Sequence, residues 1–207
     1  MRLQQDKAIV CLEGIVGSGK STQIGMLYSR FSSRFYLVPE LNDISPMKEL
    51  REELTTSGRI TRLSREDSLR LAQARGTIHK RALKESDKPL MLMDRGIYTG
   101  VVFERGPYSI HEMETISEDA GAIVPDLCFV LHCSPLLALQ RIDERRIRVG
   151  KYTQRAFHET REYIQKTRDD YFEIAAHNNS MLLIDSSGTK DEVHRKLLRE
   201  MHHAGIL

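Results

Sequence analysis

Residues 14–21 have the types and the spacing of a loop that binds phosphate groups. They read Gly-Ile-Val-Gly-Ser-Gly-Lys-Ser, which matches the P-loop pattern of glycine, any four residues, and Gly-Lys-Ser/Thr. Glycines allow the backbone to wrap closely around phosphate oxygens with its N–H groups pointing inward. The alternative is a glycine-rich turn that joins a strand to a helix by chance. The complete pattern between a predicted strand and a predicted helix favours phosphate binding.

We therefore predict that this segment binds ATP together with Mg²⁺. The lysine adds positive charge at the terminal phosphates, the serine hydroxyl is a ligand for Mg²⁺, and the following helix adds the positive end of its dipole. The motif says nothing about the group that receives the phosphate. The predicted ATP-binding residues are Gly14, Ile15, Val16, Gly17, Ser18, Gly19, Lys20, Ser21 and Thr22.

Asp94 and Arg95 directly follow the apolar run Leu90–Met93. In open parallel sheets, ligands collect at the carboxyl ends of strands, so we expect this pair to face the P-loop. Asp94 would hold a Mg²⁺-bound water or accept a proton from an attacking hydroxyl, which makes Ser21 and Asp94 the predicted metal site. Arg95 would bind the negative charge of the acceptor. The alternative is a structural ion pair that closes the strand.

Arg141, Arg145 and Arg148 have a spacing that places them on one face of a helix, with Arg146 beside them. The usual meaning of such a cluster is a solvated charged face, and the acidic residues at 143 and 144 support that meaning. Phosphoryl transfer, however, needs mobile cations that close over the reacting phosphate and exclude water. We therefore favour a lid at residues 141–155, in which Arg145 and Arg148 are the first catalytic candidates.

Three further positions are candidates for contacts with the nucleotides. Glu40 follows the second apolar run, where its carboxylate would contact the acceptor or lie exposed in a loop. Arg75 lies on a predicted helix of small and apolar residues, either as a phosphate clamp or as a surface charge. The loop of residues 185–189 is rich in turn-forming residues and suits a contact with adenine.

Five short apolar runs predict the strands that position these residues. Each run is apolar on both faces, which is typical of parallel strands covered by helices. The runs are Ala8–Leu12, Phe35–Val38, Leu90–Met93, Leu127–His132 and Met181–Ile184. Segments with helical spacing alternate with them, which predicts a doubly wound α/β fold in a single domain of residues 1–207.

The helices have their own signals. One helix follows the P-loop, and another begins at a capping box of residues 64–67, with a predicted buried face of Leu69, Ala72, Gly76, His79 and Leu83. Ser134 and Pro135 are a good N-cap and first-turn pair for a helix that continues to about Arg146. A fourth helix is predicted from Phe157 to about Ala176.

The bulk composition excludes several classes of protein. The chain has 207 residues, of which 40% are hydrophobic, so disorder is disfavoured. Its 31 basic and 29 acidic residues nearly cancel, which argues against a general nucleic-acid binder. The cysteines at 11, 128 and 133 lie in or beside apolar runs, which is typical of reduced core thiols. The polar first residues and the short apolar runs predict no signal peptide and no membrane span, and hence a cytoplasmic protein.

In the order of its motifs the chain resembles the thymidylate kinase family of nucleoside monophosphate kinases, and more distantly the deoxynucleoside kinases. The resemblance spans nearly the whole chain. The segments that carry it are Leu12–Gln23, Asp94-Arg95, Pro125–Leu127, Arg141–Arg145, Phe157–Tyr171 and Ile184–Gly188. It implies a P-loop NTPase fold with a five-stranded parallel sheet of order 2-3-1-4-5, and such enzymes are often dimers.

The resemblance also implies roles for individual residues. Arg75 falls where the family has an arginine that touches the acceptor phosphate, and Arg95 matches the arginine of the family's Asp-Arg-Tyr motif. Residues 145–148 cover its lid. A Tyr-Gln pair that meets the base in the family corresponds to Phe103-Glu104. Phe103 is therefore a predicted substrate-binding residue, together with Glu40, Arg75 and Arg95.

Several departures from the family concern the acceptor. The acidic residue that the family usually carries inside the P-loop is Val16 here, and the tyrosine after its Asp-Arg is Gly96. An arginine near the end of the second strand is missing, since residues 35–47 contain none. Val38-Pro39-Glu40 is instead similar to the deoxynucleoside kinases, in which the glutamate deprotonates the sugar hydroxyl.

Three functions follow from these observations. The first is ATP-dependent phosphorylation of a nucleoside monophosphate, with dTMP as the first candidate and Lys20, Asp94, Arg95, Arg145 and Arg148 as catalytic residues. The second is a deoxynucleoside kinase with Glu40 as base, because a sugar hydroxyl needs a base and an anionic phosphate oxygen does not. The third is an ATP-binding module without turnover. The expected partners are ATP, the acceptor and a second copy of the chain, without nucleic acid or membrane.

Overall fold

The structure is a computed structural model that describes residues 7–38, 41–150 and 156–207. Its strands form one parallel sheet in the order β2-β3-β1-β4-β5, which confirms the predicted topology. The strand bounds are β1 (Ala8–Gly14), β2 (Phe35–Val38), β3 (Leu90–Asp94), β4 (Leu127–His132) and β5 (Met181–Asp185). Each of the five apolar runs of the sequence is therefore a strand.

The chain divides into two compact units, and we describe each by itself. The first unit comprises Met1–Cys11 and Phe31–Asp126, and the second comprises Leu12–Arg30 and Leu127–Leu207. Strand β1 supplies residues to both units, because the division falls between Cys11 and Leu12. The assignment of residues 1–207 to a single domain stays a prediction.

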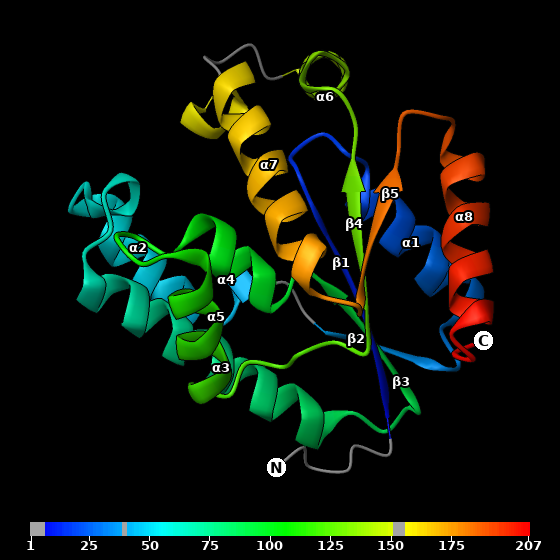
Figure 1. Ribbon diagram of the computed structural model, residues 1–207, viewed down its shortest axis with the longest axis horizontal. Coiled ribbons are helices and arrows are strands. Elements are labelled where there is room, and N and C mark those ends of the chain that lie inside the picture. The colour runs from blue at the N-terminus through cyan, green and yellow to red at the C-terminus, as the bar shows by residue number, and fades with distance from the viewer. Residues whose placement is uncertain (1–6, 39–40, 151–155) are drawn as a thin grey trace. The chain divides into compact units, whose positions relative to one another are not determined.

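The first unit combines strands β2 and β3 with four helices. Residues 35–38 of β2 pair in register with residues 90–93 of β3. The helices are α2 (Met47–Thr56), α3 (Arg65–Glu85), α4 (Ile97–Phe103) and α5 (Ile110–Asp119), and α3, α4 and α5 pack against one another (Figure 1). Two short 3₁₀ helices, Leu41–Asp43 and Arg59–Thr61, flank α2. The capping box predicted at Ser64 is present, since its hydroxyl accepts from the Asp67 N–H and the Asp67 carboxylate accepts from the Ser64 N–H.

Helix α3 is buried on two faces, whereas the sequence predicted one. Gly76 and His79 are buried as predicted and face the turn at residues 120–123. A second face of α3, formed by Leu71, Ala74 and Ile78, packs against apolar residues of α2. Leu69, which we predicted on the buried face, is 38% exposed. The prediction was wrong there because a single helical stripe cannot represent a helix that contacts two neighbours.

The second unit combines strands β4 and β5 with four helices. Residues 128–132 of β4 pair in register with residues 181–185 of β5. The helices are α1 (Lys20–Phe31), α6 (Pro135–Arg148), α7 (Arg161–His177) and α8 (Lys190–His203), and both α7 and α8 contact β5, one on either side of it in Figure 1. Ser134 caps α6 through the Leu137 N–H. The helix predicted from Phe157 is a 3₁₀ helix over Phe157–Glu159 followed by α7.

The described residues contain no helix that is long and apolar enough to cross a membrane. Cys11, Cys128 and Cys133 are buried thiols of the sheet region, as their apolar surroundings in the sequence predicted.

Candidate active site

The P-loop connects β1 to α1, which is the context that the motif requires. Its three glycines have positive φ angles of 125°, 77° and 92° at Gly14, Gly17 and Gly19. A Cβ atom on Gly14 would lie 2.0 Å from the Leu131 carbonyl oxygen, and one on Gly17 would lie 2.5 Å from that of Ala138. A Cβ atom on Gly19 would meet no atom within 4 Å. The first two glycines are therefore needed for close packing against β4 and α6, and the third for its backbone conformation.

Lys20 is held inside the loop that precedes it. The residue is 6% exposed, and its ammonium group donates to the carbonyl oxygens of Gly14 at 2.9 Å and Ile15 at 2.7 Å. Ser21 and Thr22, the next two residues of α1, are exposed. The positive charge of the lysine and the amino end of α1 thus lie together, which suits an anionic ligand.

Val16 belongs to the apolar core of the second unit. It packs against a cluster of Ile15, Cys133, Ala138, Ile142 and Ile164. This contact gives position 16 an apolar role, and it is the position that we noted as a departure from the acidic residue of the resemblance.

A buried carboxyl group directly precedes the P-loop. Glu13 is 0% exposed, and the Tyr171 hydroxyl donates to its Oε2 at 2.8 Å from helix α7. We predicted no role for Glu13 from the sequence, although an ionisable residue inside an apolar strand indicates a partner, because buried charges need one. This hydrogen bond ties α7 to the strand that carries the loop.

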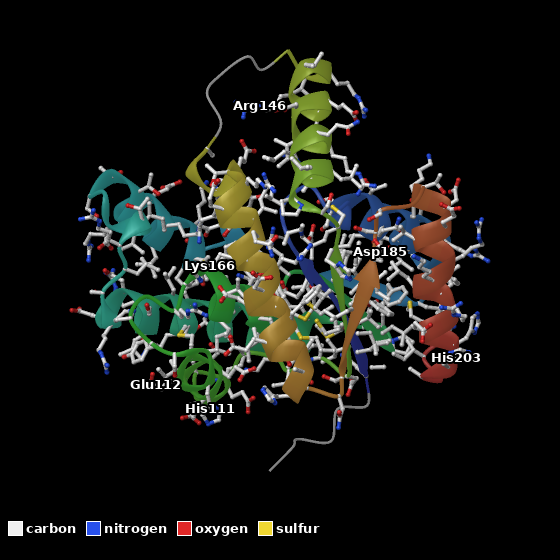
Figure 2. All side chains as sticks on the ribbon, turned by 45° about the horizontal axis from the view of Figure 1, so that its top comes forward. His111, Glu112, Arg146, Lys166, Asp185 and His203 are labelled. Carbon is white, nitrogen blue, oxygen red and sulfur yellow. The ribbon has the colours of Figure 1, made fainter. Side chains whose placement is uncertain are left out.

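Two arginines of α6 are committed to structural contacts. Nη2 of Arg141 donates to three carbonyl oxygens of the loop after β5, those of Ser186 at 2.9 Å, Ser187 at 3.4 Å and Gly188 at 3.3 Å. Arg146, seen on α6 in Figure 2, pairs with Glu159 at 2.8 Å. Arg141 therefore organises the loop that we predicted to contact adenine.

The two arginines of α6 that we predicted as catalytic are exposed. Arg145 has a side chain that is 61% exposed and lies 3.9 Å from Glu159, a distance at the limit of an ion pair. Arg148 is exposed in the last turn of α6. Residues 151–155 of the predicted lid lie outside the described residues, as does Glu40.

The ends of β4 and β5 carry titratable groups whose ordinary pKa values are shifted. Burial lowers the pKa of His132 and raises that of Cys133, so both side chains are neutral near pH 7. Hydrogen bonds from the side chain and the backbone of Ser187 lower the pKa of Asp185, which lies at the end of β5 in Figure 2. Asp185 is therefore the charged group among these three.

In the first unit, Asp94 ends β3, and Arg95 has a strained backbone. Its φ angle of 70° is the one positive value at a non-glycine residue in the described part of the chain. Such conformations are unfavourable by about 1–3 kcal/mol and cluster at functional sites. The Arg95 guanidinium lies 5.3 Å from the centre of the Phe103 ring and donates to Thr99 Oγ1 at 3.3 Å. The structure thus brings together two of the predicted acceptor residues, Arg95 and Phe103.

Arg75 is a buried member of an ion-pair network, and the alternative of a surface charge is wrong. Its side chain is 2% exposed, and its guanidinium pairs with Glu104 at 2.6 Å and donates to the Gly96 carbonyl oxygen at 2.9 Å. Arg51 of α2 pairs with the other carboxylate oxygen of Glu104 at 2.8 Å. No role was predicted for Arg51 from the sequence, and Glu104 was noted only as the counterpart of the glutamine in the family's Tyr-Gln pair. A direct contact of Arg75 with the acceptor phosphate stays a prediction.

A family model for thymidylate kinase matches residues 12–197, which is most of the chain. The chain belongs to the thymidylate kinase family. This membership makes it a nucleoside monophosphate kinase, a phosphotransferase, and confirms the resemblance of the sequence motifs.

Individual members of the thymidylate kinase family align along nearly their full length. The thymidylate kinase of Halothermothrix orenii is 29% identical over 202 residues, which covers 93% of this chain and 95% of that protein. The thymidylate kinase of Fervidobacterium nodosum is 24% identical over 200 residues, with 92% and 96% covered. The solved structure of thymidylate kinase from Candida albicans matches the fold with a TM-score of 0.67 at 19% identity, covering 97% of this chain and 93% of that one.

Proposed function

We propose that this chain transfers the γ-phosphoryl group of ATP to dTMP. The observation that carries the proposal is the complete P-loop, with Lys20 held in it, in a chain of the thymidylate kinase family. In this reaction the protein contributes mainly positioning and charge stabilisation, because the transferred group carries its own reactivity.

On the donor side, the P-loop N–H groups and Lys20 bind the phosphates of ATP. Arg145 and Arg148 are the cations that approach the transferring phosphate, because their side chains are exposed at the end of α6. Arg141 and Arg146 are held by the Ser186–Gly188 carbonyl groups and by Glu159, so they shape the surroundings instead.

Mg²⁺ is expected to accompany ATP, and hydroxyl and carboxylate oxygens are the type of ligand that it binds. It prefers oxygen ligands and keeps several waters and phosphate oxygens, so it needs few protein groups. The Ser21 hydroxyl and the Asp94 carboxylate are the side chains that we assign to it. The described residues contain no group of three or more His, Cys, Asp or Glu side chains that would hold a metal by themselves. When bound, the metal neutralises charge on the phosphates.

On the acceptor side, Arg95 binds the phosphate of dTMP, and Phe103 lies against the same guanidinium. A monophosphate oxygen is already anionic, so this reaction requires no strong base. Glu40, which a nucleoside kinase would need as base, is outside the described residues. Neither the deoxynucleoside kinase nor the module without turnover has support from the family match.

An acceptor panel tests the proposal. The purified chain is incubated with Mg²⁺ and ATP plus either dTMP, other monophosphates or unphosphorylated nucleosides, and acceptor-dependent ADP release is measured. We expect the fastest release with dTMP. Release confined to nucleosides would instead support the deoxynucleoside kinase, and tight ATP binding without ADP release from any acceptor would support the binding module.

We also propose that the chain forms a homodimer and is located in the cytoplasm. Both rest on the family resemblance and on the sequence. Sedimentation equilibrium of the full chain tests the first, with twice the chain mass as the expected result.

A further inference from the structure

Gln23 joins helix α1 to helix α8 within the second unit. The residue is 2% exposed, and its side-chain amide has a partner at each end. Nε2 donates to the Lys190 carbonyl oxygen at 2.8 Å, and Oε1 lies 3.1 Å from Nδ1 of the buried His194. Both partners belong to α8, which lies beside α1 in Figure 1. One buried glutamine thus holds the beginning of α8 against α1.

The hydrogen bond to Lys190 determines the direction of the one to His194. Because Nε2 of Gln23 faces a carbonyl oxygen, Oε1 is the atom that faces the histidine, and an amide oxygen accepts. The network therefore assigns a proton to Nδ1 of His194. Burial lowers the pKa of His194, so the ring is neutral near pH 7 and Nδ1 carries its single proton. Each group from His194 through Gln23 to Lys190 thus has a defined role as donor or acceptor.

Lys190 is the first residue of α8 and directly follows the loop of residues 185–189, which we predicted to contact adenine. This loop is held from two helices. Arg141 of α6 donates to the carbonyl oxygens of residues 186–188, and Gln23 of α1 donates to the carbonyl oxygen at the end of the loop. The conformation of the loop therefore depends on α1 as well as on α6.

Helix α1 also carries the lysine that we assign to the phosphates of ATP. Lys20 is its first residue, and Gln23 follows three residues later, about 4.5 Å along the helix axis. A ligand that is bound at its phosphates by the P-loop and at its base by another loop needs both loops at a fixed separation. Binding is tighter when this separation is set before the ligand arrives. Gln23 connects the two loops through a helix and buried hydrogen bonds.

We propose that Gln23, supported by His194, positions the loop of residues 185–189 for the base of ATP. Gln23 is a positioning residue, because it acts through the loop and does not itself touch the nucleotide. The inference rests on the proposed function, in which ATP is the phosphoryl donor. The alternative is that the two hydrogen bonds only join α1 to α8 and stabilise the fold.

The test compares ATP with tripolyphosphate, which has the phosphates but lacks the base and the ribose. Both are titrated calorimetrically, in the presence of Mg²⁺, into the full chain as the wild type, Gln23→Met and the control Gln165→Met. Methionine keeps the unbranched shape of glutamine without its amide, and Gln165 donates to Asp169 on the exposed side of α7. We expect Gln23→Met to weaken ATP binding about 10-fold, the effect of one to two neutral hydrogen bonds, and to leave tripolyphosphate binding unchanged. Gln165→Met should change neither.

Two variants of His194 provide a second measurement, which also applies if Gln23→Met does not fold. His194→Leu removes the donor to Gln23, and ATP binding should weaken about 3-fold while tripolyphosphate binding is unchanged. His194→Asn places an amide N–H near the position of Nδ1 and should restore most of the wild-type affinity for ATP. If the asparagine variant binds ATP as weakly as the leucine variant, the supporting role of His194 is wrong.

The outcomes separate the role of Gln23 from the proposed function. Equal weakening of ATP and tripolyphosphate by Gln23→Met, or unchanged ATP binding, would overturn the role of Gln23. A wild type that binds ATP no more tightly than tripolyphosphate would overturn it as well, because the base would then contribute nothing. If the selective loss of ATP affinity is found but the wild type releases no ADP with dTMP, the proposed function fails and the role of Gln23 stands. If ADP is released with dTMP and the loss is not selective, only the role of Gln23 fails.

Discussion

Lys20 is the residue on which the proposed donor site depends most directly. Replacing it with alanine removes the positive charge that the Gly14 and Ile15 carbonyl groups hold inside the P-loop. We expect Lys20→Ala to lower the rate of ADP release with dTMP by about 100- to 1,000-fold, as for other groups that stabilise transition-state charge. The control Lys166→Ala removes an exposed lysine that pairs with Asp170 on α7 (Figure 2) and should keep the wild-type rate. A near-normal rate for Lys20→Ala would contradict our placement of the donor phosphates.

The hydrogen bond between Tyr171 and Glu13 joins α7 to the strand before the P-loop, and we expect it to stabilise the folded chain. Tyr171→Phe removes the hydroxyl that donates to a buried carboxyl group, and we expect the free energy of unfolding to fall by about 1–3 kcal/mol. Urea unfolding measures it, with Tyr28→Phe, an exposed site on α1, as the control. If both variants unfold at the same urea concentration as the wild type, the hydrogen bond contributes nothing to the fold.

Among individual residues, the sequence predicted the roles of those that act together within one contiguous segment. The P-loop was recognisable because its glycines, lysine and serine are contiguous. Arg51 and Glu104 are 53 residues apart, and no local pattern shows that one pairs with the other. The burial of Arg75 was not predicted for the same reason. An arginine is rarely buried unless it is paired, and its partner Glu104 is distant in the sequence.

Helix α3 packs very closely against the turn that contains Ala120. A Cβ atom on Gly76 would lie 2.1 Å from the Ala120 carbonyl oxygen, whereas one on Gly25 of α1 would meet nothing within 4 Å. We therefore expect Gly76→Ala to destabilise the chain by several kcal/mol, about the size of severe core defects. Gly25→Ala should stabilise it by up to about 1 kcal/mol, because alanine is the better helix former. Thermal unfolding of the two variants checks the opposite signs, and an unchanged or raised melting temperature for Gly76→Ala would refute the contact.

Strands were easier to predict than helices. A run of four to six mostly apolar residues marks a buried parallel strand, and each of the five runs proved to be one. Helices α2 and α8 were missed although their buried residues have helical spacing, as at Met47, Leu50 and Leu54. Helix α4 is only seven residues long and almost entirely buried, so its sequence has no polar face that would distinguish it from a strand.

For the molecule as a whole, buried histidines predict how stability depends on pH. His79 accepts a hydrogen bond from the Ile123 N–H, and burial, together with nearby Arg75, lowers its pKa to about 3. In the unfolded chain its pKa is near 6.5, so between these values the unfolded state binds more protons. The contribution of neutral His79 is thus complete above pH 6.5 and is lost as the pH falls toward 3. Burial also lowers the pKa values of His132 and His194, which act in the same direction.

Urea unfolding between pH 7.5 and pH 4.5 measures this dependence. We expect the free energy of unfolding to fall by up to about 1.4 kcal/mol per pH unit from His79 alone, and His79→Asn should show a shallower slope. His111→Asn, on α5 in Figure 2, removes an exposed histidine and should keep the wild-type slope. Parallel curves for the wild type and His79→Asn would show that His79 titrates alike in both states.

The division of the chain into two units sets an order of events during synthesis on the ribosome. All residues of the first unit have been made once translation passes Asp126, whereas the second unit still lacks residues 127–207. At that stage Gly14 and Gly17 have neither β4 nor α6 to pack against, although the P-loop was translated long before. Arg75 and Arg95 have therefore been made together with every other residue of their unit while the P-loop still lacks the segments that it packs against. A nascent chain accordingly becomes able to hold ATP only late in its own production.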